Sequence, residues 1–362
     1  MIKESSNTKE KLSPLLLAWW DHFGRHDLPW QINPNLYRVW ISEIMLQQTQ
    51  VKTVLKYYPR FIAAFPTVTS LASSSEDKVL HYWSGLGYYR RARNLFKAAK
   101  QVVNNFGGQV PEDFDELVSL PGIGRSTAGA ILALTKGQRH PILDGNAKRV
   151  LARVFGIEGW LDSSAAQKKL WRIADECTLE NRVSNYTQAI MDLGATICTR
   201  GTANCNACPV IRICKAYQTH RVENIPAPRP KKIKPQREVI MLLVVFKKGV
   251  LLEKRSSEGI WAGLWSFPEL SKLEQLRDWS VKHIGHQSYS QELWPTISHS
   301  FSHFDLKIHP IELRLESSLN FQLEKTQWVW YKSSSPIDIG LAAPVTRLLK
   351  TLSDKQLKLG VH

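Results

Sequence analysis

The sequence predicts a multidomain protein in which an all-α body is followed by a smaller α+β domain. Three observations support this fold class. Apolar residues recur every three to four positions through residues 1–225, the period of an amphipathic helix. Residues 226–237 (PAPRPKKIKPQR) contain four prolines and five basic residues without an acid, so we expect an extended linker there. Beyond it the apolar residues alternate as in strands, which places the α+β domain at 238–350 and a C-terminal tail at 351–362.

In the body, turns containing Gly or Pro separate the expected helices. The clearest helical segments are residues 76–86, 90–106, 126–137 and 147–157. In the second domain, residues 238–255 (EVIMLLVVFKKGVLLEKR) predict two strands joined by a Lys-Lys-Gly turn. Two further strands are expected within residues 306–316 and 326–332, with a helix at residues 271–284.

The charge of the chain favours a polyanionic partner. The 362 residues carry a net charge of +16, and residues 1–225 hold 28 Lys and Arg against 19 Asp and Glu. Nucleic acid is the usual partner of such a surface, although a merely soluble basic surface is the alternative. The longest aliphatic stretch, Met241–Phe246, is too short to cross a bilayer, and the polar N-terminal residues contain no apolar signal segment. We therefore expect a cytoplasmic protein.

Four of the five cysteines lie close together, as Cys198-x6-Cys205-x2-Cys208-x5-Cys214. Four thiolates in one loop suit either a structural zinc ion or an iron–sulfur cubane, and the spacing leaves both open. Cys177 lies on a helical pattern and is expected in the core.

Two glycines and one carboxylate form the next motif. In LPGIGRSTAGAILAL, Gly122 and Gly124 allow a tight turn that opens into a helix, whose free N–H groups can grip a phosphate. A simple helix–helix connection is the alternative. Asp144 follows in PILDGNAKRV, either as a helix N-cap or as a carboxylate beside the bound nucleotide.

A second carboxylate, Glu43, lies among apolar residues in YRVWISEIMLQQTQV. Burial there would raise its pKa and let it carry a proton near neutral pH; the alternative is a solvated position on the polar face of a helix. Nearby amides such as Gln48 are suited to reading base edges or filling a base stack. In GLGYYRRAR, Tyr88 offers a stacking face and the arginines can meet phosphates.

Together these residues resemble the helix-hairpin-helix DNA glycosylase superfamily and, within it, the MutY-type adenine DNA glycosylases. The resemblance covers about residues 10 to 350, and five motifs carry it: SEIMLQQTQV, GLGYYRRARNL, LPGIGRSTAGAI, LDGNAKRVL and FSH. It implies a bacterial base-excision-repair enzyme, monomeric and associated with the nucleoid through duplex DNA. Its substrate would be adenine opposite 8-oxoguanine or guanine. It also implies that the four-cysteine loop holds a [4Fe–4S] cluster.

The resemblance assigns roles residue by residue. Glu43 matches the acid that protonates adenine at N7, Asp144 matches the carboxylate that stabilises the oxocarbenium-like sugar, and Asn146 helps to position the reacting groups. The flipped adenine would be received by a pocket. The matching pocket and base-stack positions are Trp30, Gln48, Tyr88, Ser126 and Gln188.

Ser126 also decides between two reaction types. Related glycosylases with lyase activity carry a nucleophilic Lys at the matching position, so Ser126 predicts a monofunctional glycosylase. Lys148 could trap an abasic sugar as a side reaction, but a phosphate contact or a solvated helix position is the favoured interpretation. A bifunctional enzyme acting on oxidised pyrimidines and a non-catalytic iron–sulfur DNA-binding protein are the two alternative functions.

The second domain resembles a Nudix fold, through GIWAGLWSFPEL and its flanking strands. The acidic REx2EE arrangement that a catalytic Nudix domain needs for Mg²⁺ is missing after Pro268. We therefore expect recognition rather than hydrolysis. The resemblance gives the 8-oxoguanine contact to Phe301, Ser302 and His303; the alternative is an ordinary loop at a strand edge.

Overall fold

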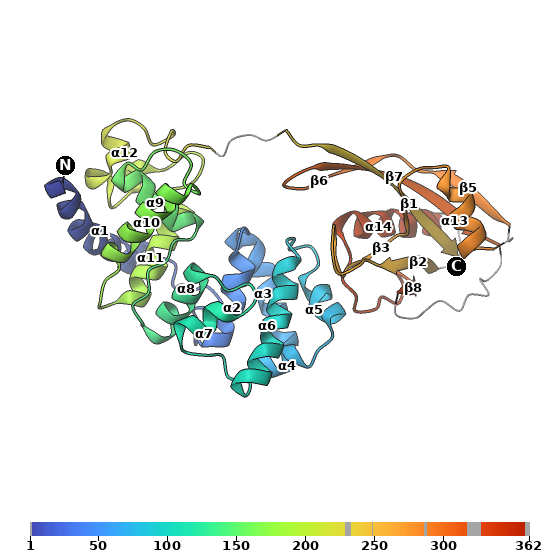
Figure 1. Ribbon diagram of the computed structural model, residues 1–362, viewed down its shortest axis with the longest axis horizontal. Coiled ribbons are helices and arrows are strands. Elements are labelled where there is room, and N and C mark those ends of the chain that lie inside the picture. The colour runs from blue at the N-terminus through green and yellow to red at the C-terminus, as the bar shows by residue number, and fades with distance from the viewer. Residues whose placement is uncertain (1, 229–232, 248, 286–287, 317–326, 359–362) are drawn as a thin grey trace. The chain divides into compact units, whose positions relative to one another are not determined.

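The computed structural model describes residues 2–228, 233–247, 249–285, 288–316 and 327–358 (Figure 1). The chain folds into two compact units. The first comprises Met1–Ser73 and Asn94–Pro230, and the second comprises Ser74–Arg93 and Lys231–His362. No helix among the described residues is long and apolar enough to cross a membrane.

The first unit is helical, as predicted. It contains α1 (Ile2–Phe23), α2 (Leu36–Leu46), α3 (Val51–Ala64), α4 (Val68–Ala72), most of α6 (Arg90–Phe106), α7 (Phe114–Ser119), α8 (Arg125–Lys136), α9 (Gly145–Phe155), α10 (Ser164–Cys177), α11 (Val183–Thr196) and α12 (Lys215–Gln218). Helix α11 packs against α1, α8 and α9, so it occupies the centre of the unit. Cys177 is 1% exposed in the core formed there, which confirms its predicted structural place.

Local sequence explains the helices that carry the motifs. Helix α8 begins after Gly124, whose N-cap position has no side-chain cap, and α9 begins after Asp144, whose carboxylate accepts a hydrogen bond from the Ala147 N–H. Both helices end at a glycine in the left-handed region, Gly137 and Gly156, a conformation that glycine adopts without steric cost.

The second unit is built on one mixed sheet, with strand order β3-β2-β1-β7-β5. Its strands are β1 (Gln236–Phe246), β2 (Gly249–Lys254), β3 (Trp265–Ser266), β4 (Glu269–Leu270), β5 (Tyr289–Leu293), β6 (Ile297–Ser300), β7 (Asp305–Leu315) and β8 (Trp328–Tyr331). The central pair, β1 and β7, is parallel. Residues 239–246 of β1 form a continuous apolar run, as expected for a strand covered on both faces, whereas β7 alternates apolar and polar residues. The predicted strands are confirmed; the turn between the first two includes Lys248, outside the described residues.

Helices complete the second unit and show where the sequence-based boundaries differ from the structure. α13 (Gln275–His283) confirms the predicted helix, and α5 (Glu76–Trp83) clusters with the sheet although the sequence placed it in the all-α body. Residues 351–358, predicted as a tail, continue α14 (Ala343–Lys358), because apolar side chains such as Leu352 are buried in the domain. The linker prediction falls partly on residues 229–232, and the tail on 359–362, both outside the described residues.

Candidate active site

Glu43 is held on α2, a helix that buries most of its surface. The Asn35 side chain caps its N-terminus by accepting a hydrogen bond from the Arg38 N–H at 2.9 Å, and Trp40, Ile44 and Met45 are buried. Glu43 as a residue keeps intermediate exposure, but its carboxyl group is enclosed by protein. Burial, and secondly the negative charge of Asp144, raise the pKa of Glu43 to about 8. Glu43 therefore carries a proton at neutral pH.

Asp144 is the N-cap residue of α9, which confirms the N-cap interpretation. A capping carboxylate can also lie beside a bound nucleotide, so the two interpretations are compatible. Its Oδ1 accepts from the Ala147 N–H at 2.7 Å. Burial raises the pKa of Asp144, opposed by hydrogen bonds from Ala147 and Asn146 and by the charge of Arg149. Donors of this kind stabilise the ionised form. The two carboxylates are close enough for one to shift the other's pKa, yet only Asp144 has donors arranged around it.

Asn146 is held by a close approach between α9 and α11. A Cβ atom added at Gly194 would lie 2.6 Å from Asn146 Cβ, so only glycine fits there. Arg149 donates from Nη2 to Asn146 Oδ1 at 2.9 Å and to the Gly194 carbonyl at 2.6 Å. Its Nε donates to the Cys198 carbonyl at 2.7 Å, which ties this helix to the start of the cysteine loop.

Ser126 lies on the first turn of α8, and its hydroxyl accepts from the Leu143 N–H at 2.9 Å. This hydrogen bond anchors the backbone immediately before Asp144. Ser126 is not among the side chains that line the base-sized cavity described below, so the structure gives it a supporting contact where the resemblance implied a pocket position.

The predicted hairpin has the features of an anion site. Gly122 is exposed with φ +87°, in the left-handed region, whereas Gly124 has φ −98° and needs no special freedom. Because Gly124 caps α8 without a side chain, the first-turn N–H groups remain available to a ligand. The Gln47 amide donates to Thr127 Oγ1 at 3.3 Å and so joins α2 to this helix.

A cavity of about 220 Å³ opens beside these elements. At about 30 Å³ per water molecule, it has room for a planar base. Trp30 and Gln188, both predicted for the base pocket, line it together. Val39 also lines it and lies one turn before Glu43 on the same face of α2. The remaining lining residues are Trp20, His26, Gln31, Pro34, Leu134, Ser184 and Asn185. No motif in the sequence singled these out.

Gln48 and Tyr88, predicted to enter the base stack, lie in different units and share two features. Both have positive φ values, 56° and 49°, which are uncommon for residues with a side chain. Both are exposed, Tyr88 to 53%. Such strained, exposed positions are frequent at ligand contacts.

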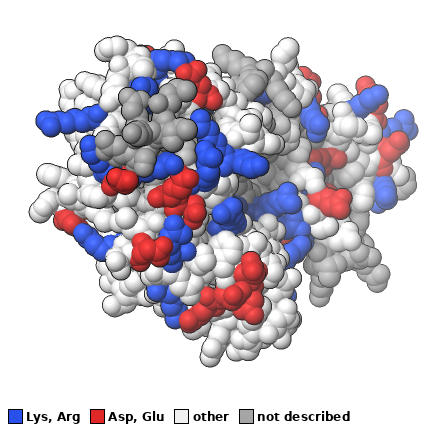
Figure 2. Space-filling model, turned by 60° about the vertical axis from the view of Figure 1, so that its left-hand side comes forward, with Lys and Arg blue, Asp and Glu red and all other residues white. Residues whose placement is uncertain are grey.

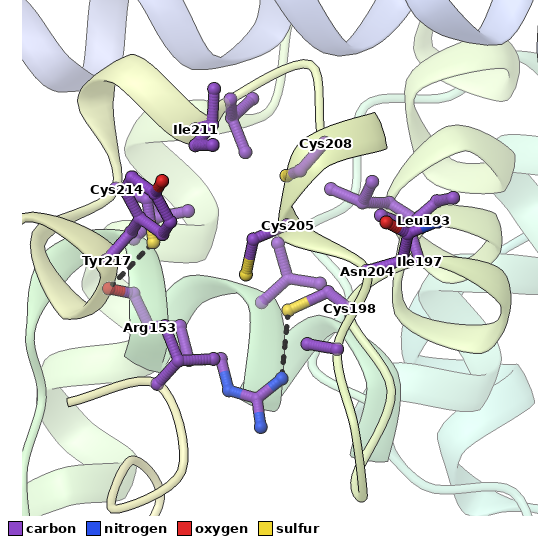
Figure 3. A pocket seen from close by; sticks show the side chains of 15 residues that line it. Arg153, Leu193, Ile197, Cys198, Asn204, Cys205, Cys208, Ile211, Cys214 and Tyr217 are labelled. Carbon is purple, nitrogen blue, oxygen red and sulfur yellow. Dashed lines mark hydrogen bonds between the residues drawn. The ribbon is translucent and has the colours of Figure 1, made fainter. Parts of the chain in front are cut away.

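The four cysteines of the loop come together around one small cavity of about 20 Å³ (Figure 3). Two short 3-10 turns, η1 (Cys205–Ala207) and η2 (Ile211–Ile213), arrange the loop. Arg153 Nη1 lies 3.3 Å from Cys198 Sγ. Burial is the main cause that raises the pKa of Cys208 to about 12, and the neighbouring thiols add to it. Thiols in this position need a positively charged partner to become ligating thiolates.

In the second unit, the loop Phe301–Phe304 joins β6 to β7 and divides the three predicted contact residues. Phe301 is half-buried, stacked on Phe304 with ring centroids 4.5 Å apart and packed against Trp261 at 5.4 Å. Ser302 and His303 are exposed, with Ser302 Oγ 3.3 Å from His303 Nδ1. Phe301 therefore supports the loop, while the two polar side chains are available to a ligand.

Figure 2 shows Lys and Arg side chains in patches scattered over this face, with groups of Asp and Glu between them and uncharged residues over most of the surface. The net charge of +16 is thus carried in part by exposed Lys and Arg side chains, which are the groups that contact a phosphate backbone.

Comparison with known proteins identifies both parts of the chain. Residues 41–176 match the HhH-GPD superfamily of base excision DNA repair proteins, and residues 239–351 match the NUDIX domain family. Among solved structures, a thermostable thymine-DNA glycosylase is similar with a TM-score of 0.54 and 25% identity, covering 59% of this chain and 98% of that one. An endonuclease III–DNA complex, at 21% identity and a TM-score of 0.51, covers 59% of this chain and 97% of that chain and shares the fold.

The curated relatives extend the match over both units. The adenine DNA glycosylase of Buchnera aphidicola subsp. Acyrthosiphon pisum is 41% identical over 95% of this chain and 98% of that protein. The adenine DNA glycosylase of Rattus norvegicus is 34% identical over 83% of this chain and 70% of that protein. Identity at this level along nearly the whole length confirms the resemblance, and the chain belongs to the adenine DNA glycosylase family of base-excision repair enzymes.

Proposed function

We propose that this protein removes adenine from A:8-oxoguanine and A:G pairs by hydrolysing the N-glycosidic bond, acting as a monomer on cytoplasmic, nucleoid DNA. One observation carries the proposal: two neighbouring enclosed carboxylates have different environments. Burial raises the pKa of both, to about 8 for Glu43, whereas at Asp144 the rise is opposed by hydrogen bonds from Ala147 and Asn146 and by the charge of Arg149. Carboxylates in different environments take the roles of acid and anion at one site.

The mechanism follows from these environments. The adenosine leaves the base stack and its base enters the cavity lined by Trp30 and Gln188. Protonated Glu43 donates to adenine N7, which makes the base a better leaving group. Ionised Asp144 stabilises the positive charge that develops on the sugar, and water completes the hydrolysis. Asn146, held by Arg149, keeps the position of the anion constant.

Two contacts support a monofunctional enzyme. Position 126 carries a serine hydroxyl in place of an amine, and this hydroxyl accepts a hydrogen bond from the Leu143 N–H. Lys148, the nearest candidate amine, forms an ion pair with Asp162 at 2.9 Å. An amine held as a cation is a poor nucleophile, so Schiff-base chemistry and strand cleavage are not expected.

We also propose that the cysteine loop holds a [4Fe–4S] cluster, which would bind the loop to the helical body. Four thiolates around one zinc ion lie roughly 3.8 Å apart, because Zn–S bonds of about 2.3 Å point to the corners of a tetrahedron. Among the described residues, no group of three His, Cys, Asp or Glu side chains is placed to hold one metal ion. The four thiols nevertheless line one cavity and shift one another's pKa values. The choice of a cluster over a single zinc ion rests on the resemblance to the adenine DNA glycosylase family.

Purified protein is therefore expected to be yellow-brown, with about four iron atoms and four labile sulfides per chain. Cys205→Ser should lower iron content and DNA affinity, because one ligand is lost. Cys177→Ser is the matched control, since Cys177 is buried in α10 and does not line the cavity of the loop, and it should retain full iron. Stoichiometric zinc without iron, in protein expressed with ample iron, would contradict the cluster.

The proposed lesion contact predicts a selective effect of the loop in the second unit. Replacing both Ser302 and His303 by Ala should lower excision from A:8-oxoguanine by about tenfold, the value of one or two lost hydrogen bonds, while A:G changes little. The control is Ser298→Ala, a similar exposed serine on β6. Equal losses on both duplexes would instead indicate general DNA binding.

The overall proposal is tested with duplexes carrying A:8-oxoguanine, A:G, A:C and thymine glycol, scoring base loss separately from strand nicking. We expect adenine loss without nicking. Nicking at thymine glycol would favour the bifunctional alternative. Tight duplex binding without base loss would favour a non-catalytic iron–sulfur protein.

A further inference from the structure

Asp192 is a buried carboxylate that the proposed mechanism does not use. It lies on α11 with 0% of its surface exposed. Gln188 precedes it by one helical turn, so the two side chains share a face of the helix. Gln188 also lines the base-sized cavity. The carboxylate thus lies directly behind a residue that contacts the bound base in the proposed function.

Every acceptor position of Asp192 is used. Oδ2 accepts from Trp20 Nε1 at 3.1 Å and from the Arg25 backbone N–H at 2.8 Å. Oδ1 accepts from Arg25 Nε at 2.9 Å, from Arg25 Nη2, and from Gln188 Nε2 at 2.8 Å. The Arg25 guanidinium compensates the buried charge, as a carboxylate without solvent requires.

This network determines which atom of the Gln188 amide faces the cavity. A carboxylate can only accept hydrogen bonds, so Gln188 must present its NH₂ group to Asp192. Its carbonyl oxygen, on the other side of the planar amide, has no hydrogen-bond donor among the described residues. The cavity therefore contains a hydrogen-bond acceptor at this position.

An acceptor there separates two classes of purine. Adenine carries an amino group at position 6, which donates, whereas guanine and hypoxanthine carry an oxygen at that position, which accepts. A buried acceptor forms a hydrogen bond with the 6-amino base and repels the oxygen of the 6-oxo base. Because the 6-oxo base leaves this polar group unpaired, the site should discriminate strongly between the two bases.

We propose that Asp192 is a positioning residue that sets base selectivity: by holding the NH₂ group of Gln188, it keeps an acceptor toward the cavity and selects 6-amino over 6-oxo purines. This inference rests on the proposed function. It adds a residue that acts through Gln188 and does not itself touch the substrate.

The test is Asp192→Asn in the full-length protein. The new amide must place its NH₂ group on one of the two oxygen sites. The Trp20 indole and the Arg25 backbone N–H are fixed donors on the Oδ2 side, whereas the Arg25 side chain is 24% exposed and can move away from the Oδ1 side. The NH₂ group therefore faces Gln188, which turns over to accept from it and presents its own NH₂ to the cavity.

The measurement is single-turnover excision of adenine and of hypoxanthine opposite 8-oxoguanine. We expect the adenine-to-hypoxanthine rate ratio of Asp192→Asn to fall at least about tenfold from its wild-type value. Equal losses on both bases, with the ratio unchanged, would overturn the proposal, because damage to folding alone lowers both rates together.

Two further variants sharpen this result. Asp192→Glu keeps the carboxylate and should keep the ratio, even where the absolute rates fall. In a Gln188→Ala background there is no amide to orient, so Asp192→Asn should no longer alter the ratio; a persisting change would overturn the proposal. Such a double-mutant cycle isolates the coupling between the two side chains.

A measurement on the wild-type protein covers the case in which Asp192→Asn does not fold. Duplexes carrying non-cleavable 2′-fluoro nucleotides are compared, with adenine, unsubstituted purine or hypoxanthine opposite 8-oxoguanine. An acceptor in the cavity predicts weaker binding of hypoxanthine than of purine, because two acceptors repel. The reverse order would overturn the proposal. Failure of the proposed function is distinguishable, since the wild-type protein would then not excise adenine at all.

Discussion

Replacing Glu43 by Gln should lower the rate of adenine release by about 10²–10⁴-fold, the contribution of a positioned general acid. The amide keeps the shape of the side chain but has no acidic proton to transfer to adenine N7. Duplex binding should change little, because the carboxyl group of Glu43 is enclosed by protein and is not placed on the surface that meets the phosphates. Single-turnover excision and a binding measurement on the same duplex check both statements. Near-normal excision by the variant would remove Glu43 from the mechanism.

The same residue predicts a pH dependence. With a pKa of about 8, Glu43 is protonated below that pH and loses its proton above it, so the single-turnover rate should fall above pH 8. Ionised Asp144 is also required, which adds a fall on the acid side and gives a bell-shaped profile. In Glu43→Gln the residual rate should lose the alkaline limb. An alkaline limb that remains in the variant would assign the proton to another group.

Glu43 should also reduce stability at neutral and alkaline pH. Its pKa rises from 4.5 in the unfolded chain to about 8 in the fold, so its contribution to the unfolding free energy is fully present below pH 4.5 and is lost as the pH rises toward 8. At pH 7 the loss is at most about 3 kcal/mol. Denaturant unfolding should therefore show Glu43→Gln to be more stable relative to wild type at pH 8 than at pH 5.

Replacing Asp144 by Asn should lower excision by about 10²–10³-fold, because the negative charge that stabilises the developing cation is lost. The fold should be preserved, since Asn is as good an N-cap as Asp and can still accept from the Ala147 N–H. Single-turnover excision and thermal unfolding of the same preparation test the two parts. Full activity in Asp144→Asn would make this residue purely structural.

Asp144→Ala is the matched comparison. It removes the charge and the cap together, so it should lose as much activity as Asp144→Asn and in addition about 1 kcal/mol of stability. If only the Ala variant lost activity, the cap rather than the charge would be the functional feature.

Much of this protein follows from local patterns in the sequence. The periods of apolar residues predict its helices and strands, because one face of each element must be buried. Asp144 stands immediately before an apolar helical pattern and is the N-cap residue of α9. Cys198, Cys205, Cys208 and Cys214 are close in the chain, so their meeting around one cavity needs only a short loop. The resemblance carried by the motifs then named the family that the comparisons confirm.

Tertiary structure decided the properties that depend on contacts between distant residues. Glu43 could have been a solvated surface residue from its sequence alone; its raised pKa comes from burial and from Asp144, about one hundred positions away in the chain. The hydrogen bond from the Leu143 N–H to the Ser126 hydroxyl joins residues 17 positions apart in the chain, so the sequence alone does not predict it. Residues 351–358 look like a polar tail, and only packing shows them to be helical.

The network behind Gln188 is the clearest case of what the fold adds. Asp192 accepts from Trp20 and Arg25, which lie 172 and 167 positions earlier in the chain, and no local pattern links these residues. The sequence by itself determined the elements, the cysteine loop and the family. Only the folded chain decided which charges are buried and which way an amide faces, because desolvation and hydrogen-bond direction arise from neighbours that folding alone brings together.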